Sequence, residues 1–184
     1  MIDAELRQAV LANFPPGPSL AVVAHRESGY PDLLHARGDG APFLPLEASL
    51  PAPGSLGRVE HVLLEGVDDV ADPIELLRAV KTAAGAARLF VVVSNAAYVR
   101  GLLAFFNGAA LARAHPLVQS EIEPMLNAAG WRVLAINPIP DESIPAAQTL
   151  PFELTSATMC VTITDAAMLE RARVRAYIAI ADRE

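Results

Sequence analysis

The sequence predicts an α/β domain with a mostly parallel sheet flanked by helices, antiparallel strands at its C-terminal edge and a shortened N-terminal half. Two observations predict this class. Apolar strand-like runs alternate with amphipathic helical segments over residues 59–137, and this order requires right-handed crossovers between parallel strands. Apolar and polar residues alternate instead over residues 158–164 and 173–181, as is typical of antiparallel strands with one exposed face.

Length and composition exclude several classes of protein. With 184 residues, of which 53% are hydrophobic and 19% charged, residues 1–184 can form a single folded domain. The net charge is −7, and the one lysine and thirteen arginines are scattered, so we expect no nucleic-acid partner and no membrane surface. No apolar run reaches the roughly 20 residues that span a bilayer, and no signal-peptide pattern opens the chain. We therefore expect a cytoplasmic protein.

The first 58 residues contain few regular elements. Helical spacing of apolar residues predicts a helix over residues 3–13, which a proline-rich stretch ends. The apolar run 19–24 predicts a buried strand. Glycine and proline punctuate residues 27–58, which predicts mostly loop and edge strand, with 33–37 and 43–46 as the only short strands or turns.

Regular alternation begins at residue 59. Asp72 and Pro73 are typical of a helix N-cap and first helical position, and Gly130 is typical of the position after a helix. The predicted elements are a strand over 59–65, a helix from 73 to near 85, a strand over 88–94, helices over 97–106 and 118–129, and a strand over 131–137.

Prolines predict a loop over residues 138–151. We expect the two alternating segments that follow, 158–164 and 173–181, to be antiparallel strands at the end of the sheet. A helical turn over 166–171 joins them.

Residues 59–137 resemble the C-terminal half of a class I S-adenosylmethionine-dependent methyltransferase of the small-molecule type. The family's fourth strand and the stretch that follows it are resembled by the segment Val62-Leu63-Leu64-Glu65-Gly66-Val67-Asp68-Asp69-Val70-Ala71-Asp72-Pro73. Ser94-Asn95 matches the end of the fifth strand, and Met125-Leu126-Asn127-Ala128-Ala129-Gly130-Trp131-Arg132-Val133 resembles the closing helix and strand. The resemblance implies a Rossmann-like fold, S-adenosylmethionine as cofactor and methyl transfer to a small-molecule substrate.

The cofactor half departs from that family. A glycine-rich turn normally follows the first strand, because only glycine lets the backbone approach the cofactor closely. Here the segment 24–31 holds one glycine, Gly29, and the only acids near the expected second strand are Asp39 and Glu47. We therefore interpret residues 1–58 as a divergent cofactor half with a degenerate cofactor loop, and residues 59–184 as the methyltransferase-like half.

Polar residues follow three of the predicted strands, where ligands bind in open α/β sheets. Glu65 and Asp68 are candidates for binding the cofactor, although a solvated loop in which Asp72 caps a helix explains the same acids. His25 follows the first strand and is a candidate for gripping an anionic cofactor group, or an ordinary loop residue. Asn95 is a candidate for binding substrate, or for capping the next helix.

His115 is the candidate catalytic base. Some relatives carry a histidine near this place, and an imidazole titrates near neutral pH, although a lone loop histidine is also typical of a surface. The remaining histidines and the single cysteine, Cys160, show no metal-ligand spacing, so we expect no metal.

Two functions follow from these observations. The chain transfers a methyl group to a small molecule, or it is a non-catalytic binding or assembly module that kept the scaffold and lost cofactor binding. The apolar stretch 102–106 is a candidate lid or partner surface, or ordinary core packing. The high mean hydropathy and few charges suggest a homo-oligomer, and the short cofactor half suggests a partner subunit that completes the pocket.

Overall fold

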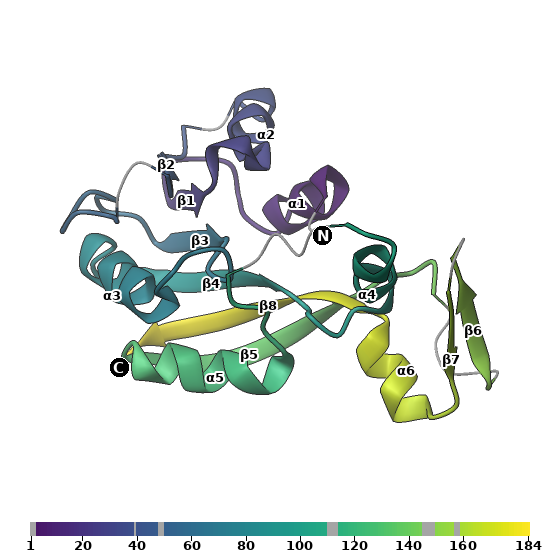
Figure 1. The fold of residues 1–184 in the computed structure, drawn as a ribbon. Helices are drawn as coiled ribbons and strands as arrows, with labels where there is room; N and C mark the ends of the chain where they lie inside the picture. The colour runs from purple at the N-terminus through teal and green to yellow at the C-terminus, as the bar shows by residue number, and fades with distance from the viewer. Residues whose placement is uncertain (1–2, 39, 48–49, 110–113, 145–149, 157–158) are drawn as a thin grey trace.

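A computed structural model describes residues 3–38, 40–47, 50–109, 114–144, 150–156 and 159–184 (Figure 1). A six-stranded sheet with the order β2-β1-β3-β4-β8-β5 forms the centre of the fold. Its strands are β1 (Leu20–Ala24), β2 (Phe43–Pro45), β3 (His61–Glu65), β4 (Arg88–Ser94), β5 (Trp131–Pro140) and β8 (Val174–Arg183). Strands β2, β1, β3 and β4 are mutually parallel, whereas β8 is antiparallel to both β4 and β5. The predicted fold class is confirmed.

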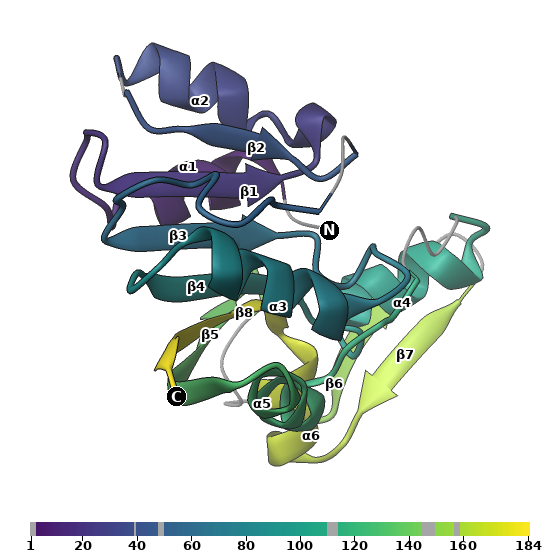
Figure 2. The same ribbon diagram turned by 90° about the vertical axis from the view of Figure 1, so that its left-hand side faces the viewer.

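Helices cover both faces of this sheet, as Figure 2 shows. On one face, α3 (Pro73–Ala83) and α5 (Gln119–Ala128) pack with the fully buried Trp131, whose indole N–H donates to the Leu77 carbonyl at 3.0 Å. On the other face lie α1 (Ala4–Leu11) and α2 (Tyr30–Ala36). All residues of β1 are buried, because the strand is central and helices cover it on both sides.

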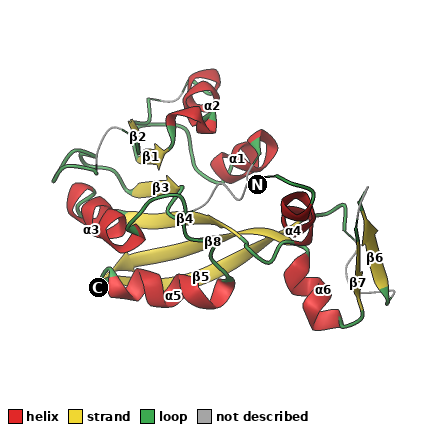
Figure 3. Ribbon diagram, in the orientation of Figure 1, coloured by secondary structure: helices red, strands yellow, loops and turns green. Residues whose placement is uncertain are grey.

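A small second layer of structure lies at one end of the main sheet (Figure 3). It contains α4 (Val99–Phe106), α6 (Ala166–Ala172) and a two-stranded sheet of β6 (Phe152–Thr155) and β7 (Cys160–Ile163). Tyr98, Ile144 and Leu169 belong to the separate apolar cluster that holds these elements together. The expectation that 158–164 ends the main sheet is therefore wrong, because this strand pairs locally with β6 and packs on its own cluster.

Two further expectations need correction. Residues 33–36 are helical rather than extended, since Pro31 lies in the first turn of α2 and Gly29 enters it with φ of 84°. Strand β5 continues through Pro138 to Pro140, where a loop was expected. A proline lacks the N–H of a ladder, but β5 is the last strand of its sheet among the described residues, so one of its sides needs no partner.

Candidate functional site

The topology brings the predicted site residues to one edge of the sheet. His25 follows β1, Glu65 ends β3, Asp68 lies in the next loop, and Asn95 follows β4. His115 precedes α5, and its backbone N–H donates to the Asp68 carbonyl oxygen at 2.9 Å. All five residues therefore lie at the carboxyl edge of the strands, where ligands bind in folds of this type.

Side chains from the ends of β1 and β2 cover the backbone of Gly66, the residue after β3. A Cβ added to Gly66 would lie 2.9 Å from His25 Cδ2 and 3.2 Å from Leu46 Cδ1, so the imidazole and the leucine rest directly on this backbone. Gly66 has φ of 95°, which glycine adopts without strain. Because Gly66 has no side chain, the His25 ring can lie directly against its backbone.

Glu47 fixes His25 in this position. It follows β2 by two residues, and its carboxylate accepts hydrogen bonds from the Arg26 backbone N–H at 2.8 and 3.1 Å. The same carboxylate lies 3.0 Å from His25 Nδ1. Hydrogen bonds from its own backbone and from Arg26 hold the pKa of Glu47 below its usual range. A strand of three residues gives too short a pattern to recognise, so the sequence did not place Glu47 at a strand end.

Gly66→Ala is expected to lower the free energy of unfolding by about 2 kcal/mol, which combines the strain of a positive φ with displacement of the His25 ring. The matched control is Gly108→Ala, because Gly108 has φ of 90° and nothing within 4 Å of an added Cβ. We expect about 1 kcal/mol for this control in urea denaturation. Equal losses for both variants would show that His25 does not press on Gly66.

Glu65 is held by an ion pair that the sequence did not reveal. Arg7 Nε lies 2.9 Å from Glu65 Oε1 and 3.1 Å from Oε2, and the side chains of Arg7 and Glu65 are only 16% and 9% exposed. The neighbouring Tyr30 is fully buried, and burial together with the Glu65 charge raises the pKa of its hydroxyl. Arg7 gives no sequence signal, because it reads as the polar face of an amphipathic helix.

His115 is exposed, and its Nε2 lies 2.9 Å from the Ala71 carbonyl oxygen. When Nε2 donates this hydrogen bond, Nδ1 is the ring nitrogen that can accept a proton. Asp68 is almost completely buried in the loop beneath it.

Asn95 directs its amide inward. Its Nδ2 donates to the carbonyl oxygens of Arg171 at 3.0 Å and Val174 at 2.8 Å, and its Oδ1 accepts from the Ala97 N–H at 3.0 Å. The side chain thereby ties the end of β4 to the turn between α6 and β8.

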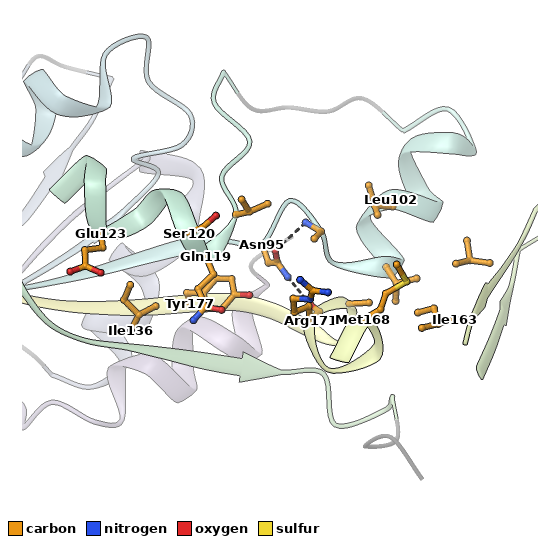
Figure 4. Close-up of a pocket in the computed structure, with 15 residues that line it drawn as sticks. Asn95, Leu102, Gln119, Ser120, Glu123, Ile136, Ile163, Met168, Arg171 and Tyr177 are labelled. Atoms are coloured by element: carbon orange, nitrogen blue, oxygen red, sulfur yellow. Dashed lines mark hydrogen bonds between the residues drawn. The ribbon is translucent and has the colours of Figure 1, made fainter. Parts of the chain in front are cut away.

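A cavity lies at this end of the sheet, beyond β4. It encloses about 790 Å³ and opens between α4, α5, α6 and β7 (Figure 4). The residues that line it are Asn95, Ala97, Val99, Leu102, Val118, Gln119, Ser120, Glu123, Ile136, Val161, Ile163, Met168, Arg171, Ala172 and Tyr177. A smaller hollow of about 300 Å³, at the tips of β1 and β2, is lined by Arg26, Glu27, Pro45 and Glu47.

A polar cluster anchors one wall of the large cavity. The Tyr98 hydroxyl donates to Asp141 Oδ2 at 2.6 Å, which ties the start of α4 to the end of β5. Burial raises the pKa of Asp141, but hydrogen bonds from Ser143 and Tyr98 and the charge of Arg100 outweigh it and lower the pKa to about 2. The carboxylate therefore stays charged and keeps its bond to Tyr98 near neutral pH.

Among the described residues, no three histidine, cysteine or acidic side chains gather closely enough to hold a metal ion. None of the helices within that part of the chain has the length and apolar character needed to cross a membrane.

Comparisons with known proteins identify the fold. No protein-family model matches the sequence, and no curated protein matches it. The structure is similar to a chain from a complex between the Haloferax volcanii Trm112 methyltransferase activator and a methyltransferase, with a TM-score of 0.60 and 20% identity over 96% of this chain and 87% of that one. It is also similar to an S-adenosylmethionine-dependent methyltransferase from Archaeoglobus fulgidus, with a TM-score of 0.59 and 14% identity over 97% of this chain and 94% of that one. An S-adenosylmethionine-dependent methyltransferase from Mesorhizobium loti is similar with a TM-score of 0.57 and 13% identity over 98% of each chain. The chain therefore has a class I methyltransferase-like fold.

The residues after β1 do not fit the cofactor of that fold. A nucleoside cofactor needs glycine backbone that it can approach and an acid free to bind its ribose. Here the turn after β1 holds a single glycine, Gly29, and His25 and Leu46 cover Gly66 after β3. Glu47 is hydrogen-bonded to the turn after β1.

Proposed function

We propose that this protein is a non-catalytic binding or assembly module built on the methyltransferase fold. One observation carries the proposal: His25 lies on Gly66 and is held there by Glu47, so the protein's own side chains take the place beside β1. The carboxylate of Glu47 also accepts from the backbone N–H of Arg26, a donor that faces the carboxyl edge. Fold alone does not supply the activity, since function depends on the site.

A second function is favoured by the position of Glu47. An acidic residue at the carboxyl end of the second strand is what the family uses to hold the ribose hydroxyls, and β2 places Glu47 there. Together with the S-adenosylmethionine-dependent enzymes among the similar structures, this supports methyl transfer to a small molecule. It requires His25 to leave Gly66 and Glu47 to release the Arg26 N–H.

A partner subunit is the assembly that best suits the proposed module. The similar Haloferax volcanii structure is a complex with an activator protein. Within the described part of this chain, Leu102, Phe105 and Phe106 of α4 are 38%, 41% and 57% exposed, which gives α4 an apolar outer surface. Such a surface is typical of protein contacts.

Titration with S-adenosylhomocysteine and S-adenosylmethionine tests the proposal. A ligand at 100 times its Kd would stabilise the fold by about 2.7 kcal/mol and raise the melting temperature by several degrees. We expect no change in melting temperature up to millimolar ligand, with an active class I methyltransferase as the positive control. A saturable rise in melting temperature would instead establish cofactor binding and overturn the proposal.

A further inference from the structure

The large cavity beyond β4 has the build of a small-molecule site. Its volume of about 790 Å³ falls within the range of ligand pockets, and most of its lining side chains are apolar. Val99 and Leu102 come from α4, Val161 and Ile163 from β7, and Met168 from α6. Leu102, Ile163 and Met168 lie toward the same side of the cavity in Figure 4, and we call the apolar residues on this side its apolar wall.

Two polar side chains, Tyr177 and Arg171, also line the cavity. Tyr177 is only 3% exposed, and no described residue forms a hydrogen bond with its hydroxyl. Arg171 lines the same cavity as Tyr177. Burial raises the pKa of Tyr177, and the positive charge of Arg171 acts in the opposite direction. The Tyr177 side chain lines the cavity, so a ligand oxygen there can accept a hydrogen bond from this hydroxyl.

Arg171 is available to a ligand. Its Nε donates to the Ala167 carbonyl oxygen at 3.2 Å, and within the described chain no acidic side chain pairs with its two terminal nitrogens. Asn95 binds the backbone oxygen of the same residue and so fixes where the side chain starts. Among the described residues that line the cavity, only Glu123 carries a carboxylate, and it lies well away from Arg171, beyond Tyr177, in Figure 4.

We propose that this cavity binds a small apolar molecule carrying one carboxylate. The carboxylate accepts hydrogen bonds from the Arg171 guanidinium and the Tyr177 hydroxyl, since charge-assisted hydrogen bonds to an arginine are strong and directional. The apolar part lies along Leu102, Ile163 and Met168. This inference names a ligand for the binding module proposed above, but it uses other residues, because neither His25 nor Glu47 lines the cavity.

Calorimetric titration of the full chain with decanoate tests the inference, with decyltrimethylammonium as a cation of the same chain length. We expect saturable decanoate binding at least tenfold tighter than that of the cation. Arg171→Gln should weaken decanoate binding at least tenfold and Tyr177→Phe about fivefold, because each removes a donor to a charged group. Arg58→Gln is the matched control, since Arg58 is exposed and does not line the cavity.

The location of the ligand is read from methyl resonances. Decanoate should shift the methyl signals of Met168 and Ile163 and leave the Trp131 indole signal unchanged, since Trp131 does not line the cavity. Absence of saturable binding to the wild-type chain would overturn the inference, as would equal affinities for Arg171→Gln and Arg58→Gln. Arg171-dependent decanoate binding together with cofactor binding would support this inference while refuting the proposed function, so the two fail separately.

Discussion

Replacing Arg7 with alanine is expected to lower the free energy of unfolding by about 3 kcal/mol, because it leaves the Glu65 carboxylate buried without its partner. Glu65 lies at the end of β3 with a side chain only 9% exposed, and Arg7 donates hydrogen bonds to it from Nε and Nη2 on α1. Urea denaturation followed by circular dichroism measures the change. A loss of this size would show that α1 is fixed over the carboxyl edge of the sheet by charge as well as by apolar packing.

Two further variants isolate the cause. Arg58→Ala removes an exposed arginine and is expected to change stability by less than about 0.5 kcal/mol. Combining Arg7→Ala with Glu65→Gln removes the charge that would otherwise be stranded, so the double variant should recover part of the lost stability. If Arg7→Ala costs no more than Arg58→Ala, the ion pair does not hold the edge closed.

Replacing Asn95 with alanine is expected to cost about 3 kcal/mol. The carbonyl oxygens of Arg171 and Val174 and the N–H of Ala97 would each lose a hydrogen-bond partner, at roughly 1 kcal/mol or more apiece. The loss is measured by the same denaturation. Decanoate binding should also weaken, because Asn95 holds the end of α6 that carries Arg171.

The matched control for this variant is Asn127→Ala. Asn127 is exposed on α5, and its alanine variant should stay within about 0.5 kcal/mol of the wild-type stability. An unchanged stability for Asn95→Ala would mean that its amide is free for a ligand, as the substrate-binding interpretation of Asn95 requires.

The sequence predicted the central strands well, because their signals are local and strong. The apolar run 88–94 coincides with β4, and Asp72 caps α3 as expected, accepting from the Glu75 N–H at 2.8 Å. Sequence-based prediction failed where contacts between residues distant in the sequence determine which strands pair. Strand β6 has only four residues, and β7 pairs with it rather than with the main sheet, because an apolar cluster outside the main core holds both.

The sequence predicted where these polar residues lie in the fold better than it predicted what they contact. Parallel strand order alone brings His25, Glu65 and Asn95 to one edge, and the structure has them there. What those residues do depends on partners far away in the sequence. Arg7 is 58 positions from Glu65, and Arg171 is 76 positions from Asn95, and no local pattern connects either pair.

The central claim is that the protein's own side chains fill the place beside β1. A crystal structure of the protein grown with about 5 mM S-adenosylhomocysteine tests this claim most directly. That concentration is on the order needed to fill even a weak site with a millimolar Kd. We expect the His25 ring on Gly66, the Glu47 carboxylate on the Arg26 N–H and no nucleoside density between them. Nucleoside density in that space, with His25 turned away from Gly66, would contradict the claim.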